Sequence, residues 1–96
     1  MGKRDEFVEN IKKQLDDWNI KIKNMEAKVR DSGNKVQDRY KKDVENLKQK
    51  RDELSDKLDK VRASSEDAWE EVKIGAKGSA EILKDTFDKI LEKFKS

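Results

Sequence analysis

The sequence predicts an all-α protein, an antiparallel three-helix bundle of coiled-coil type. Three observations lead to this prediction. Apolar residues recur every three or four positions, which places them on one face of a helix. Two places interrupt the pattern: residues 31–34 are four poor helix formers, and residues 64–67 resemble a helix start. The three segments that remain have nearly equal lengths, which is typical of helices packed side by side in a bundle.

The first helix is predicted at about residues 3–31. Its apolar residues are spaced alternately by three and four, so they form a heptad stripe with charged residues on the other faces. We predict that the core residues of this helix are Val8, Ile11, Leu15, Trp18, Ile22, Met25 and Val29. The residues that follow disfavour helices or favour turns, and they predict a hinge made of Asp31, Ser32, Gly33 and Asn34.

The second and third helices are predicted at about residues 35–62 and 65–95. Ser64 has the side chain of an N-cap, and the acids after it suit a first helical turn, so the third helix is expected to start there. The core of the second helix is predicted to contain Val36, Tyr40, Val44, Leu47, Leu54, Leu58 and Val61. The third helix has a broader apolar face, with core residues Trp69, Val72, Leu83, Phe87, Ile90 and Phe94.

A second architecture fits the same pattern. Val29 and Val36 are seven residues apart, so the stripe keeps its phase through Ser32 and Gly33. One long helix over residues 3–62, with helix 65–95 folded back, would then pair with a second chain as a domain-swapped dimer. We favour the closed bundle because four consecutive weak helix formers favour a turn. Either way, residues 1–96 form one helical domain.

The composition argues against an enzyme. Lys and Arg number 24 and Asp and Glu 22, with the two signs interleaved, and the chain has no Cys and no His. It therefore lacks disulfides, thiolate chemistry, the commonest general base and the commonest metal ligand. Adjacent carboxylates such as Asp16 and Asp17 do not share a helix face. We predict no catalytic residue, no cofactor and no metal site.

The same pattern limits the partners. Acids interleave with the basic residues, and Tyr40 lies on the apolar stripe rather than beside them, so nucleic-acid binding is not expected. No apolar run reaches the roughly 18 residues that a membrane span needs. We therefore expect a cytoplasmic protein. The thin supply of apolar residues in a chain of this size predicts a homo-oligomer, a dimer or higher.

Several short segments resemble a known family. They include Leu15-Asp16-Asp17-Trp18-Asn19, Lys50-Arg51-Asp52-Glu53 and Ser64-Ser65-Glu66-Asp67-Ala68-Trp69-Glu70 with Gly75 after it. Over nearly its whole length, the chain is similar to a family of small, largely uncharacterised bacterial coiled-coil proteins, some of which are labelled stress-response proteins. The resemblance implies a bacterial, cytoplasmic, helical protein and brings no catalytic or binding residue. The family segment that matches 30–39 favours a continuous helix, whereas Ser32-Gly33-Asn34 do not.

The sequence leads to two functional hypotheses. The first is a non-enzymatic coiled-coil structural or interaction protein that self-associates through its heptad apolar faces; the resemblance adds a link to the stress response. The alternative is reversible binding to a membrane surface or lipid through the amphipathic helix 65–95. The sequence identifies no particular protein partner.

Overall fold

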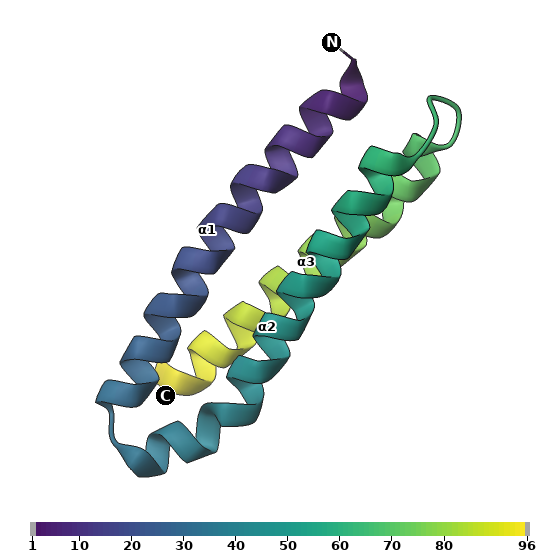
Figure 1. Ribbon diagram of the computed structural model, residues 1–96. Coiled ribbons are helices and arrows are strands. Elements are labelled where there is room, and N and C mark those ends of the chain that lie inside the picture. The colour runs from purple at the N-terminus through teal and green to yellow at the C-terminus, as the bar shows by residue number, and fades with distance from the viewer. Residues whose placement is uncertain (1, 96) are drawn as a thin grey trace.

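The computed structural model describes residues 2–95 and contains three helices: α1 (Lys3–Asp31), α2 (Asn34–Ala63) and α3 (Trp69–Lys95). In Figure 1 they run down, up and down again, in an elongated molecule of 50 × 19 × 18 Å. The predicted all-α three-helix bundle is confirmed. The predicted domain, 1–96, includes Met1 and Ser96, which lie outside the described residues. The continuous helix over 3–62 does not form in this structure, because α1 and α2 are separate.

The turn between α1 and α2 depends on one glycine. The N–H of Ser32 reaches the carbonyls of Lys28 and Val29, and the N–H of Gly33 reaches that of Arg30, which completes the last turn of α1. Gly33 then adopts φ 105° and ψ 165°, a conformation that is essentially restricted to glycine. The chain reverses direction there, and α2 begins at the next residue.

The start of α3 differs from the prediction. Ser64 does not cap α3; it is the C-cap of α2, and its hydroxyl donates to the Val61 carbonyl at 2.6 Å. Residues 65–68 form a turn in which the N–H groups of Ala68 and Trp69 both donate to the Ser65 carbonyl. The prediction that α3 starts at residue 65 is therefore wrong by four residues, because the chain uses this segment to reverse direction.

A side chain of α1 fastens this loop to the bundle. The guanidinium of Arg4 donates to the backbone carbonyl of Ser64 and lies 3.7 Å from the Glu66 carboxylate. Phe7, one turn further along α1, contacts the ring of Trp69 with 6.4 Å between ring centroids. The start of α1 and the start of α3 are thereby held together at the loop end of the bundle.

The core is built mainly around α2. Leu47, Leu54 and Val61, all fully buried, face the other two helices, and α2 packs against both α1 and α3. The predicted core residues that are buried are Val8, Ile11, Trp18, Ile22, Met25, Val29, Tyr40, Val44, Leu47, Leu54, Leu58, Val61, Trp69, Leu83 and Ile90. Those that are only half-buried are Leu15, Val36, Val72, Phe87 and Phe94.

Two small residues of α3 also lie in the core. Ala76 is fully buried and Ser79 is nearly so; Ser79 was not predicted as a core residue. Trp69, Ala76 and Leu83 follow one another by seven, so Ala76 continues the heptad of α3. A small side chain at such a position lets two helix backbones approach closely, which agrees with the close packing of α2 on α3.

Candidate functional site: the seam between α1 and α3

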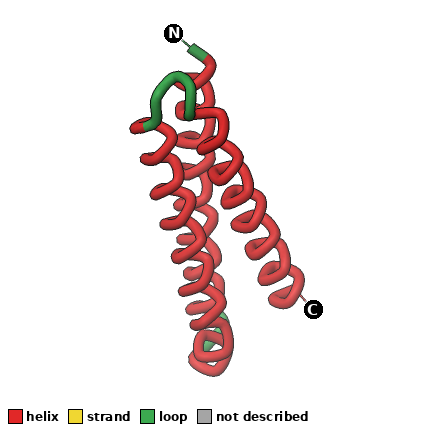
Figure 2. Tube along the Cα trace, turned by 90° about the vertical axis from the view of Figure 1, so that its right-hand side faces the viewer, coloured by secondary structure: helices red, strands yellow, loops and turns green. Residues whose placement is uncertain are grey.

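The two outer helices meet differently from the other pairs. The backbones of α1 and α3 stay farther apart than either does from α2, and α3 is inclined to the other two helices (Figure 2). Large side chains bridge the space between α1 and α3. The rings of Trp18 and Phe87 meet edge to face, with centroids 5.3 Å apart and planes at 67°. We call this line of contact the α1–α3 seam.

Two hollows lie along the seam, one on each side of the Trp18–Phe87 pair. The first, the Trp18 hollow, has a volume of about 490 Å³. It lies between α1 residues Phe7, Gln14 and Trp18 and α3 residues Lys77, Ala80 and Lys84. The second, the Phe94 hollow, has a volume of about 200 Å³. It lies between α1 residues Lys21, Met25 and Lys28 and α3 residues Phe87, Leu91 and Phe94.

The floor of the seam is apolar and open to solvent. Phe7, Phe87, Leu91 and Phe94 pack against the buried core but keep part of their surface exposed. Phe94 also meets the ring of Tyr40 edge to face at 5.4 Å, which fixes it at the far end of the seam. The rings are therefore held in place by the core while one side of each remains available for contact.

Lysines border the seam from both helices. Lys21 and Lys28 are seven residues apart on α1, and Lys73, Lys77 and Lys84 occupy one flank of α3 at spacings of four and seven. Two of the ammonium groups lie over aromatic rings: Lys21 Nζ is 4.8 Å from the centroid of Trp18 and Lys73 Nζ is 5.0 Å from that of Trp69. Such cation–π contacts hold a charge beside an apolar surface.

None of these five lysines forms an ion pair with any carboxylate among residues 2–95. The α1–α2 side of the bundle is different, because charges of opposite sign face one another there. Lys48 Nζ of α2 lies 3.1 Å from the Glu26 carboxylate of α1, and the hollows on that side are lined by both signs. The seam therefore combines an apolar floor with positive charges that the described residues leave unpaired.

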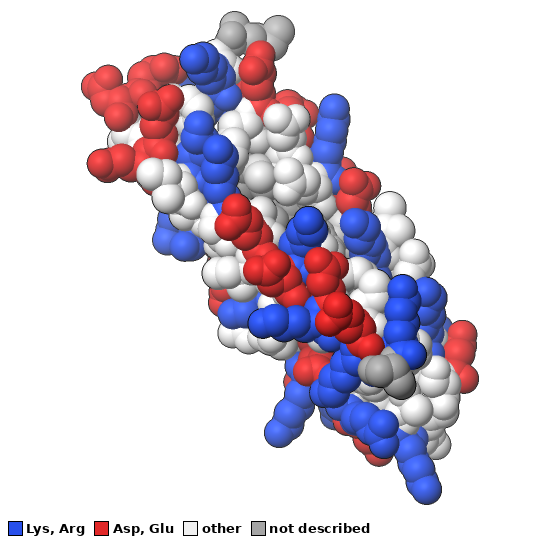
Figure 3. All heavy atoms as spheres, turned by 180° about the vertical axis from the view of Figure 1, so that it is seen from behind, with Lys and Arg blue, Asp and Glu red and all other residues white. Residues whose placement is uncertain are grey.

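The acids of α3 lie mainly on the flank that faces away from the bundle. Glu81, Asp85, Asp88 and Glu92 follow one another by four, three and four residues, which places them in one row. Figure 3 shows this row of red side chains running toward the C-terminal end of the molecule. Glu81 is the member that also lines the Trp18 hollow. Lys73, Lys77 and Lys84 therefore lie on the flank of α3 next to this acidic row.

The sequence located only part of this site. Trp18, Met25, Phe87 and Phe94 were predicted as core residues and do line the seam, whereas Phe7, Lys21 and Lys28 of α1 were not predicted to form a site. A signal for the α1 side exists, because Phe7, Gln14, Lys21 and Lys28 are spaced by seven and so share one flank. Which flank meets α3 depends on the direction in which the turn at Gly33 folds the chain. Of the predicted hinge residues, Asp31 ends α1, Ser32 and Gly33 form the turn and Asn34 begins α2, and none of them lines the two hollows of the seam.

Residues 2–95 contain neither a cluster of metal ligands nor a membrane-spanning helix. Among residues 2–95, no group of three or more acidic side chains is placed to hold a metal ion. No helix within the same residues is long and apolar enough to cross a membrane. Comparison with protein-family models, curated proteins and solved structures gave no significant match. The resemblance to bacterial coiled-coil proteins therefore stays a prediction.

Proposed function

We propose that this chain is a non-enzymatic helical interaction protein that self-associates by exchanging α1 between two copies. The observation that carries the proposal is the heptad phase, which runs unbroken from Val29 of α1 to Val36 of α2 across a turn of only two residues. If Gly33 became helical, α1 and α2 would join into one helix with a single apolar stripe. On the resemblance to stress-labelled proteins, we assign this association to a cytoplasmic stress response.

The exchange would preserve the contacts of the core. Trp18 of one copy would meet Phe87 of the other, and Glu26 would pair with the other copy's Lys48. The loop between α2 and α3 would stay as it is, so the contacts between those two helices would remain within one chain. Because the same surfaces are buried in both forms, the balance between them depends on the turn and on the protein concentration.

An opened chain would not persist alone. α1 has six buried apolar side chains: Val8, Ile11, Trp18, Ile22, Met25 and Val29. Exposing a buried apolar side chain costs about 1.5–3 kcal/mol, so releasing α1 would cost on the order of 9–18 kcal/mol. That is comparable with the whole stability of a small domain, about 5–15 kcal/mol. An opened chain should therefore either close again or bind a second opened chain.

Disulfide trapping tests the proposal directly, because the chain has no cysteine of its own. The double variant Glu26→Cys/Lys48→Cys replaces an ion pair that joins α1 to α2, with 3.1 Å between its charged atoms. In the closed monomer the disulfide forms within one chain, whereas in the exchanged dimer it joins two chains. The matched control is Asp43→Cys/Lys93→Cys, which replaces an α2–α3 ion pair of 3.3 Å. That disulfide stays within one chain in both forms.

The expected result is a covalent dimer from Glu26→Cys/Lys48→Cys that grows with protein concentration before oxidation. The control should give a monomer on the same non-reducing gel. If the α1–α2 variant forms its disulfide within the chain and gives no covalent dimer at any concentration, α1 is not exchanged. Dimer in equal amount from both variants would indicate random collisions between surface cysteines, and it would contradict the proposal as well.

A further inference from the structure

We propose that the α1–α3 seam binds a single-chain amphiphile with an anionic head, of the fatty-acid class. The acyl chain would lie against the aromatic floor, and the carboxylate would meet the lysines at the border. This goes beyond self-association and does not depend on it, because an exchanged α1 would form the same seam with the α3 of the other copy.

The apolar part of the ligand is indicated by the shape and composition of the floor. The Phe94 hollow is lined by Met25, Phe87 and Leu91 as well as Phe94 itself, and the Trp18–Phe87 pair lies between it and the Trp18 hollow. From residue 7 to residue 28, α1 extends about 32 Å at 1.5 Å per residue. The seam therefore follows α1 over most of its length and has apolar side chains on its floor, which suits a flexible hydrocarbon chain better than a compact ring compound.

The charge of the head is indicated by the lysines. Lys21 and Lys28 line the Phe94 hollow, and Lys77 and Lys84 line the Trp18 hollow, so each hollow has two ammonium groups at its border. None of the four has a carboxylate partner among residues 2–95. Glu81 is the acidic side chain among the lining residues of the two hollows, so the balance of charge there is positive. A carboxylate head would supply the missing partner.

A single chain fits the seam better than the surface of an anionic bilayer does. The rings of Phe87 and Phe94 are half-buried in concave hollows instead of protruding from the bundle. The row from Glu81 to Glu92 runs along the neighbouring flank of α3 (Figure 3), and anionic lipid headgroups would repel it. A free amphiphile enters the seam without approaching that row.

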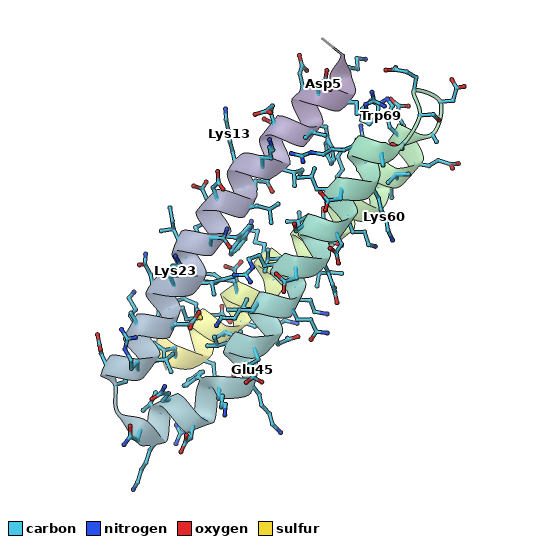
Figure 4. The ribbon with its side chains drawn as sticks, viewed as in Figure 1. Asp5, Lys13, Lys23, Glu45, Lys60 and Trp69 are labelled. Carbon is cyan, nitrogen blue, oxygen red and sulfur yellow. The ribbon has the colours of Figure 1, made fainter. Side chains whose placement is uncertain are left out.

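The test is a titration with sodium dodecanoate, kept well below the concentration at which it forms micelles. Binding is followed by calorimetry and by tryptophan fluorescence, to which Trp18 at the seam contributes together with Trp69. The variant Lys21→Gln/Lys84→Gln removes one charge from each hollow. The matched control is Lys23→Gln/Lys60→Gln, since both side chains are exposed and lie outside the two hollows, with Lys23 pointing away from the bundle (Figure 4). Two further ligands are titrated for comparison with dodecanoate. Dodecanol has the same chain and no charge, and vesicles of phosphatidylglycerol present an anionic bilayer surface.

We expect saturable binding of dodecanoate to the wild-type protein and to the control, and weaker binding of dodecanol. Each lysine removed from the seam should weaken dodecanoate binding about two- to five-fold, as for other exposed charge pairs. Equal affinity of both variants for dodecanoate would overturn the proposal. So would equal affinity for dodecanoate and dodecanol, or binding to the vesicles with none to monomeric dodecanoate. Failure of helix exchange in the disulfide experiment would leave these results unaffected.

Discussion

Replacing Gly33 with alanine should shift the protein from the closed monomer toward the exchanged dimer. In the closed turn Gly33 has φ 105° and ψ 165°. No atom stands within 4 Å of an added Cβ, so the cost of alanine is in the backbone conformation and not in a clash. In a continuous helix, the same substitution replaces the poorest helix former except proline by the best.

The size of the shift follows from two free energies: the cost of alanine in the closed turn and its gain over glycine in a continuous helix. A residue other than glycine in this region of backbone conformation costs about 1–3 kcal/mol. Alanine is favoured over glycine inside a helix by about 0.8–1.0 kcal/mol. Together they favour the open chain by about 2–4 kcal/mol, and a dimer contains two such chains. Gly33→Ala should therefore strengthen dimerisation by about 4–8 kcal/mol, which is roughly a thousand- to a million-fold in the dissociation constant.

The assay is size-exclusion chromatography with light scattering over a range of concentrations. Gly78→Ala is the matched control, because Gly78 is inside α3 and nothing lies within 4 Å of its added Cβ. It should raise the stability of the monomer by about 1 kcal/mol without changing its mass. Inserting two glycines after Gly33 should have the reverse effect on exchange, because it lengthens the turn. A Gly33→Ala protein that stays monomeric and melts like the wild type would refute the reasoning.

Four further substitutions test individual contacts by thermal unfolding. Leu83→Ala should cost about 2–5 kcal/mol because Leu83 is fully buried, whereas Ile82→Ala next to it should change stability by less than about 0.5 kcal/mol because Ile82 is 51% exposed. Phe87→Leu should cost about 0.5–1.5 kcal/mol more than its change in buried area implies, because one ring of an edge-to-face pair is lost. Arg4→Gln should cost about 1–2 kcal/mol by releasing the carbonyl of Ser64 in the loop. Equal losses at Ile82 and Leu83, no loss at Phe87, or an unchanged melting curve at Arg4 would each contradict the contact concerned.

The fold class could be predicted because helical periodicity is a local signal. The spacing of Val8, Ile11 and Trp18 places them on one face whatever the rest of the chain does. The turn at Ser32 and Gly33 was predicted from intrinsic helix propensity, which is also local. The start of α3 was not predicted correctly, since Ser64 and the acids after it suit both a helix start and a turn. In the structure Arg4, which is distant in sequence, donates a hydrogen bond to the Ser64 carbonyl, and a local pattern does not reveal such a contact.

The seam could be predicted only in part, for a geometric reason. A stripe shows which residues face inward, but not which neighbour each flank of the stripe meets. Phe87 and Phe94 were predicted as core residues, yet they are half-buried, because the backbones of α1 and α3 stay apart and no further helix within residues 2–95 covers the space. The grouping of Lys21 with Lys84 across the seam likewise required the packing of three helices.

Small-angle scattering of the concentrated wild-type protein, combined with its absolute mass, tests helix exchange most directly. The closed monomer has a mass of 11.3 kDa and a Cα radius of gyration of 15.5 Å. A continuous helix over residues 3–62 would be about 90 Å long, and a rod of that length has a radius of gyration of about 26 Å. We predict that raising the concentration doubles the mass and moves the radius toward the larger value. A mass and a radius that stay at the monomer values up to millimolar concentration would contradict the exchange.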